Sequence, residues 1–240
     1  MTRTRPRRAH ALCAGSVSLA LATAACGGTT TASEPTTQDL VPDSALNGLL
    51  LNRNDIGVIM NGAALITEPV SSTMDDNRNM LPNLNCLGVW HPGEAAIYGT
   101  ADTPGSWRSV RTQLLRAPGN DQWRSSVVQS VTSYPTPDGA RDFLAQSADR
   151  WGKCTNHTVN ITLNDQRLPR WRSGDLTAAP DRLRMPITRT TETAASSCEH
   201  ILAARVNVVI DVLACAPRST DVRQASVIAD RIAANVPTSG

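Results

Sequence analysis

Six cysteines constrain the fold of this 240-residue chain more than any other feature of its sequence. Cys13 lies inside an apolar stretch near the start, and Cys26 ends that stretch. The other four are spread over the following sequence: Cys86, Cys154, Cys198 and Cys215. In an exported protein such an even set predicts disulfides that tie distant segments together, whereas a reducing compartment favours free thiols or metal ligands. The compartment therefore decides which folds are available.

The first 25 residues have the pattern of an export signal. Four arginines and no acidic residue precede an apolar run from Ala11 to Ala25. This run is shorter than the about 20 residues that a membrane-spanning helix needs. Gly, Thr and Ser follow it. We therefore expect residues 1–25 to be a signal peptide that is removed on export.

Cys26 follows two alanines directly, which is typical of a bacterial lipoprotein signal. In that class the peptide is cut before the cysteine, and acyl chains such as palmitate are attached to it. The usual Leu, Val or Ile three residues before the cysteine is Thr23 here. Ordinary cleavage, which would release a secreted protein, is the alternative. We expect acylation at Cys26, a flexible tether over 26–40, and a lipid anchor on the outer face of the cell membrane.

Without residues 1–25 the formal net charge falls from +2 to −2, because those residues hold four arginines and no acid. A nearly neutral chain argues against nucleic acid as a partner. Roughly 200 residues remain, which is enough for one domain with its own core. We place this domain at residues 41–237.

The stretch from Ser197 to Cys215 predicts a hairpin and, with it, the disulfide pairing. It is apolar and β-branched, and it is too long for one strand, with a polar interruption at 205–207. Cys198 and Cys215 are equally distant from a turn between Val206 and Asn207, so they face each other. Cys86 and Cys154 are then paired by elimination. Val206 is unfavourable where a two-residue turn needs positive φ, which leaves open a longer loop shifted by one residue.

The remaining periodicity predicts a mixture of helices and strands. Helices are expected to begin near Asp43 or Ser44 and near Asn54 or Asp55, and to cover 94–98, 137–151 and 221–236. Strands are expected at 65–70, 107–115, 123–134, 155–163, 167–178 and 182–190, the second and third joined by a turn.

Sequence signatures of catalysis are absent. Beyond the signal peptide there is no Gly-x-Ser-x-Gly, and the chain has no His-Glu-x-x-His and no P-loop. His91 and Glu94 could form an acid–base pair one helical turn apart. We favour a structural role, in which His91 precedes a helix and Glu94 supports its first turn. We also expect Asp211 to point outward from an alternating strand.

The residue types of a four-ligand zinc site are present in the sequence. Its four ligands would be Cys154, His157, Cys198 and His200. An oxidising compartment favours disulfides at both cysteines instead, so no metal is expected.

The chain has five tryptophans and one phenylalanine. They could stack on wall sugars, but more often such residues fill a core or its rim.

Four stretches of the sequence occur together in a recognisable order. Residues 85–95 read NCLGVWHPGEA, residues 107–111 read WRSVR, residues 207–215 read NVVIDVLAC, and a fourth stretch runs from Trp123 through Tyr134 to Cys154. Together they resemble the PknH-like extracellular domain family, over roughly residues 41–237. That family includes the sensor domain of a mycobacterial receptor Ser/Thr kinase and stand-alone mycobacterial lipoproteins.

The resemblance implies an α/β fold of the α+β type. It would be a single domain with a central antiparallel sheet flanked by helices, two disulfides in the pairing given above, and a cleft that holds a ligand. It does not imply kinase activity, because the chain has neither His-Arg-Asp nor Asp-Phe-Gly.

We therefore expect a non-enzymatic module of the cell envelope that binds or senses a small molecule or a wall fragment, without a cofactor. A structural adaptor that binds another envelope protein is one alternative, and an unrecognised hydrolase is the other. Four side chains in the matched stretches are the first candidates for ligand contact: Trp90, His91, Glu94 and Arg111.

Overall fold

The computed structural model describes residues 39–237, apart from residues 82, 102, 104, 121, 164 and 219–221. The expected signal peptide and Cys26 lie outside the described residues. No helix in this part of the chain is both long enough and apolar enough to cross a membrane.

In the described part of the chain, nine strands form one antiparallel sheet, and two short strands pair separately. The main order is β1 (Ile66–Thr67), β2 (Ser109–Ala117), β3 (Ser125–Ser133), β11 (Val208–Pro217), β10 (Ala195–Arg205), β9 (Arg182–Thr190), β7 (Arg170–Ser173) and β4 (Thr158–Val159). β8 (Thr177–Ala179) also pairs with β9. β5 (Thr162–Leu163) pairs with β6 (Gln166–Arg167).

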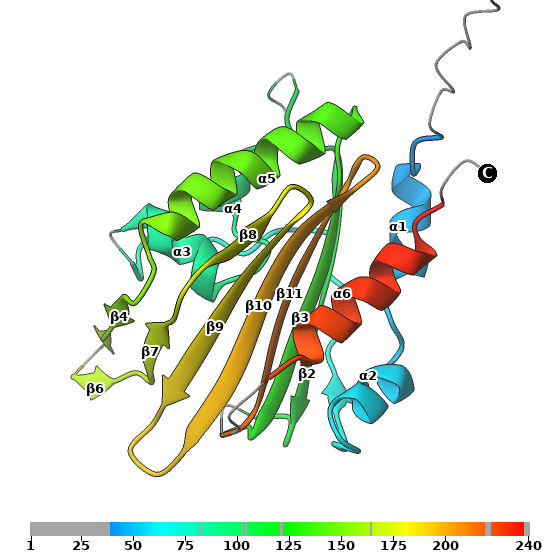
Figure 1. Cartoon of the computed structure of the whole chain (residues 1–240). Coiled ribbons are helices and arrows are strands. Elements are labelled where there is room, and N and C mark those ends of the chain that lie inside the picture. The colour runs from blue at the N-terminus through cyan, green and yellow to red at the C-terminus, as the bar shows by residue number, and fades with distance from the viewer. Residues whose placement is uncertain are drawn as a thin grey trace, which may run out of the picture. The chain divides into compact units, whose positions relative to one another are not determined.

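Helices cover both faces of this sheet (Figure 1). One face carries η1 (Asp43–Ala45), α1 (Leu46–Leu49), α2 (Arg53–Ile59) and α6 (Gln224–Asn235). The other carries α3 (Leu84–Trp90), α4 (Ala95–Tyr98) and α5 (Pro137–Gly152). Because side chains alternate along a strand, Ile201 packs into the first core and Leu202 into the second. The α+β architecture expected from the sequence is confirmed.

The β10–β11 hairpin has the predicted register. Cys198 lies opposite Cys215, their Cα atoms are 4.0 Å apart, and their sulfurs are bonded. The turn has two residues in spite of Val206, whose φ is 53°. The Val206 side chain is buried in the core, and Asn207 Oδ1 accepts the Val41 N–H at 2.8 Å. Burial and this bond offset the strain of a β-branched residue at positive φ.

The second disulfide joins Cys86 of α3 to Cys154, just after α5. Each cysteine of the hypothetical zinc set is therefore bonded to another cysteine and is not available as a thiolate ligand. Among the described residues, no group of three or more His, Cys, Asp or Glu side chains is placed to hold a metal ion.

Several predicted boundaries were wrong. Helix α3 was not predicted, because its seven residues are too few and too uniformly apolar to show a helical period. Helix α2 begins earlier than expected, since Asn52 Oδ1 accepts the N–H groups of Asn54 and Asp55 at 2.9 and 3.0 Å. The expected strand 155–163 is two short strands, β4 and β5.

Candidate ligand-binding site

An open groove of about 380 Å³ is lined by residues of β7, β9 and β10 and by Val222, which lies just before α6. Figure 1 shows no helix over the near face of β7 and β9. Leu183, Met185 and Ile187 belong to the core on the α5 side, so the alternate side chains of β9 face this groove. The groove is lined by Asn156, Arg172, Ser173, Gly174, Arg184, Pro186, Ile187, Thr188, Ser197, Cys198 and Val222.

Three polar side chains form a row across the strands that carry the groove. Arg172 of β7 pairs with Thr188 of β9, and Thr188 pairs with Ser197 of β10. Arg172 and Thr188 are exposed. Within the part of the chain that the structure describes, the Arg172 side chain makes no hydrogen bond or ion pair. The row therefore presents a cation beside two hydroxyl groups, which suits a polar or anionic ligand.

Glu199 organises one end of the groove. Its carboxylate is fully buried and accepts Arg184 Nε–H at 2.5 Å. It also accepts the Ser226 N–H and the Ser226 hydroxyl, both at 2.8 Å, and so caps the first turn of α6. Arg184, which lines the groove, is thus held in place by a buried counter-charge.

Gly174 packs closely against Pro186 beside the groove, just after β7 ends. A Cβ atom at this position would lie 2.9 Å from the Pro186 side chain, which is closer than real contacts allow. Only glycine permits the chain after β7 to approach β9 here. A larger residue would have to displace Pro186, which also lines the groove.

A second polar cluster is buried on the opposite face of the sheet, around Asp211. Its Oδ1 lies 2.6 Å from His200 Nε2, and its Oδ2 accepts the Tyr98 hydroxyl at 2.8 Å and the Gly93 N–H at 3.0 Å. His200 Nδ1 lies 2.7 Å from the carbonyl oxygen of Val89. Asp211 is 3% exposed, so the expectation that it points outward was wrong. Helices α3, α4 and α5 cover that face as well, which no local pattern in the strand reveals.

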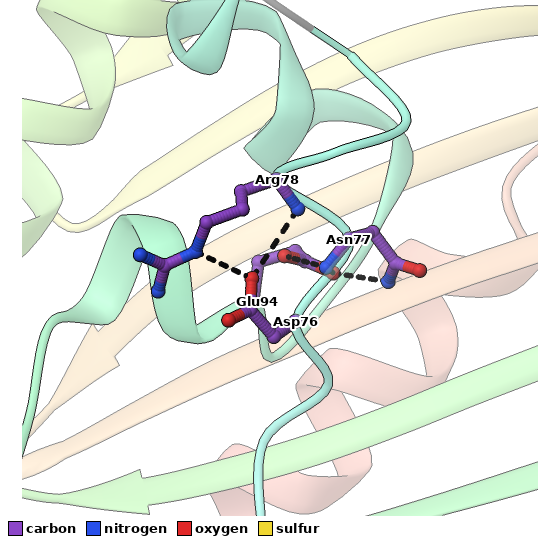
Figure 2. A network of polar contacts seen from close by, with 4 residues as sticks. All are labelled: Asp76, Asn77, Arg78 and Glu94. Carbon is purple, nitrogen blue, oxygen red and sulfur yellow. Dashed lines mark hydrogen bonds and ion pairs between the residues drawn. The ribbon is translucent and has the colours of Figure 1, made fainter.

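His91 and Glu94 lie beside this cluster, and no hydrogen bond or ion pair joins their side chains. Both line a cavity of about 10 Å³, which is about the size of one water molecule. Burial lowers the pKa of His91, and burial raises the pKa of Glu94. The Glu94 carboxylate accepts the backbone N–H of Asn77 at 3.2 and 3.1 Å and also its side-chain amide (Figure 2).

Figure 2 also shows how the loop before α3 is ordered around Glu94. Arg78 Nε donates to Asp76 Oδ1 at 2.8 Å, and these two residues flank Asn77 in the sequence. The Arg78 hydrogen bond lowers the pKa of the exposed Asp76 carboxyl. The role of Glu94 is therefore to hold residues 75–78 against the domain. It precedes α4, but its side chain does not cap that helix.

The other two candidate residues lie elsewhere. Trp90 is 3% exposed, and its ring centroid lies 6.3 Å from that of His157. Arg111 donates to Ser109 Oγ at 3.0 Å and to the Val110 carbonyl oxygen at 2.6 Å. The structure brings His91 and Glu94 together, but it gathers the four candidates into no common site, and none lines the groove.

The groove residues were not singled out from the sequence. The segment RLRMPITRT does carry a signal, because the apolar residues Leu183, Met185 and Ile187 fall on alternate positions. That pattern predicts a strand with one covered face. It does not reveal that the uncovered face borders β7 and the start of α6.

Comparison with known proteins identifies relatives of the chain. The family model described as the PknH-like extracellular domain matches residues 41–235. "Serine/threonine-protein kinase PknH" of Mycobacterium tuberculosis (strain ATCC 25618 / H37Rv) is 28% identical over 193 residues, which are 80% of this chain and 29% of that protein. The protein of the same name from Mycobacterium bovis (strain ATCC BAA-935 / AF2122/97) is also 28% identical over 193 residues, 80% of this chain and 31% of that protein.

The chain thus spans about three-tenths of the length of these curated relatives. A solved structure agrees with the sequence comparison. The crystal structure of the extracellular domain of PknH from Mycobacterium tuberculosis matches with a TM-score of 0.70 and 26% identity, and it covers 82% of this chain and 96% of that one. The chain belongs to the PknH-like extracellular domain family.

Proposed function

We propose that this chain is an envelope lipoprotein whose domain binds a small molecule or a wall fragment in the groove between β7, β9 and β10. The observation that carries the proposal is the groove itself. Its volume of about 380 Å³ falls in the range of small-molecule sites, which is about 300–1,000 Å³. A sheet supplies its floor, and rigid strands position ligand contacts better than loops.

The lining favours binding over chemical conversion. Of the described residues that line the groove, none is His, Asp or Glu, the side chains that most often act as general bases. The buried acid–base groups, His200 and Asp211, face the other side of the sheet and are sealed by helices. Membership of an extracellular domain family supports export and a sensor-like role.

Ligand binding is tested with thermal shift of the mature domain against fractionated envelope metabolites and wall fragments. We expect at least one fraction to raise the melting temperature, because a ligand that binds only the folded state stabilises it. The variant Arg172→Ala should reduce this shift. The matched control Arg205→Ala, at the other end of β10, should not. An unchanged shift in Arg172→Ala, or turnover of an ester or glycan, would contradict the proposal.

The anchor is tested by mass. Protein extracted from membranes should lack residues 1–25 and carry acyl chains on Cys26, and Cys26→Ala should be released into the medium. Retention of the Cys26→Ala variant on the membrane would contradict a lipid anchor.

An adaptor function predicts a different result in the thermal-shift experiment. In that case no small-molecule fraction shifts the melting temperature and a second envelope protein does.

A further inference from the structure

Arg189 of β9 lies between two tryptophan rings. Its guanidinium carbon is 4.1 Å from the ring centroid of Trp123 and 5.9 Å from that of Trp171. Trp171 is its direct partner across the β7–β9 pair, and Trp123 comes from the segment just before β3. Three parts of the chain that are distant in sequence therefore meet around one positive charge.

Among the residues that the structure describes, no acidic side chain forms an ion pair with this charge. Arg189 is 8% exposed, yet in the described residues its guanidinium forms no ion pair and no hydrogen bond. Burial lowers its pKa, although an arginine stays protonated at any physiological pH. Buried charges are almost always paired, because removing a charge from water is costly. The two indole rings compensate only part of that cost.

The cluster is separate from the groove. Arg189 follows Thr188 directly, and successive side chains of a strand point to opposite faces of the sheet. Thr188 lines the groove. Trp123 and Trp171 instead pack against the core that contains α3 and α5. A ligand in the groove therefore cannot neutralise Arg189.

We propose that Arg189, Trp123 and Trp171 form a second binding site, which takes a ligand that carries a carboxylate or a phosphate group. The guanidinium has five N–H donors in a planar fork that matches both oxyanions. Both tryptophans are only partly buried, so part of each side chain is accessible to an apolar part of the same ligand.

A purely structural role makes a different prediction. If Arg189 only fills space between the rings, oxyanions have no effect on the tryptophans, whatever stands at position 189. The proposal requires instead that an oxyanion binds saturably and that the binding depends on the guanidinium. The two accounts therefore separate in a direct titration.

The experiment titrates the mature domain with inorganic phosphate, acetate and glucuronate at constant ionic strength, with glucose as a neutral control. Tryptophan fluorescence and indole N–H resonances report binding, and Trp123→Phe and Trp171→Phe assign the resonances. We expect a saturable response of the two indoles to at least one oxyanion and none to glucose. A response to phosphate alone identifies a phosphate ligand, and a response to the carboxylates alone identifies a carboxylate ligand.

Arg189→Gln should weaken this binding by about tenfold or more. Arg170→Gln is the matched control, because Arg170 is an exposed arginine on the opposite face of neighbouring β7, and it should bind as the native protein does. Binding that survives in Arg189→Gln, or no indole response to any of the three oxyanions, would overturn the proposal. If Arg189→Gln does not fold, indole shifts of the native protein at tryptophans other than Trp123 and Trp171 would overturn it equally.

Discussion

His200 Nε2 lies 2.6 Å from Asp211 Oδ1, and both side chains are buried in the sheet. The other imidazole nitrogen faces the Val89 carbonyl oxygen, which only accepts. Both ring nitrogens of His200 are therefore engaged, one with a carboxylate oxygen and one with a backbone carbonyl oxygen. The pair joins β10 and β11 to the segment that carries α3 and α4, through Val89, Gly93 and Tyr98.

Replacing Asp211 with Asn should therefore destabilise the domain by about 3 kcal/mol, because an amide has one acceptor oxygen where the carboxylate has two, so a buried donor among its partners loses its acceptor. Urea unfolding of the variant measures this loss. The matched control is Asp142→Asn on the exposed side of α5, which should change the free energy of unfolding by less than about 0.5 kcal/mol. Equal effects of the two variants would show that the pair contributes nothing specific.

Glu94 should make the domain less stable as the pH rises. Burial raises its pKa above the ordinary 4.5, so the folded state favours the protonated carboxyl more than the unfolded chain does. Its contribution is complete below pH 4.5 and is lost as the pH rises through the folded-state pKa. Unfolding measured across this range should show a flatter pH dependence in Glu94→Gln, which keeps an acceptor for Asn77.

The control for Glu94 is Glu192→Gln, at an exposed position between β9 and β10. This variant should retain the pH dependence of the native protein. If the free energy of unfolding depends on pH in the same way in Glu94→Gln and Glu192→Gln, burial of Glu94 does not perturb its ionisation.

His91 acts in the opposite direction. Burial lowers its pKa below the ordinary 6.5, so the unfolded chain takes up a proton before the folded state does. Its contribution to stability is present above pH 6.5 and is lost as the pH falls below that value. His91→Gln should therefore remove part of the loss of stability on mild acidification. The same loss in the variant and in the native protein would assign it to other groups.

The two disulfides should differ in their effect on stability. Cys86–Cys154 closes a loop of 68 residues and Cys198–Cys215 a loop of 17. In the chain-entropy account these bonds contribute about 4 and about 3 kcal/mol. Paired replacement by Ala, measured by urea unfolding, should give losses in that order. A larger loss from the shorter loop would mean that strand pairing, and not loop entropy, dominates.

The hairpin shows what the sequence could predict. Two cysteines symmetric about a polar interruption specify the register of β10 and β11, because antiparallel partners have a constant sum of positions. The long helix α5 and the strand β9 were predicted for the same kind of reason, since each has a clear period of its own. These features are local, and local patterns determine them.

The buried Asp211 and the groove could not be predicted in this way. The burial of Asp211 depends on α3 and α4, which come from residues more than a hundred positions earlier. The groove depends on where α6 begins relative to β7 and β9. Both are consequences of packing between distant segments, and neither leaves a period in the sequence.

Ligand mapping by backbone amide resonances tests the central claim most directly. The mature domain is titrated with the envelope fraction that raises its melting temperature. We predict that the largest shifts fall on Arg172, Thr188 and Ser197, while the amides of α1 and α2 do not change. Shifts centred away from β7, β9 and β10 would show that the groove is not the binding site.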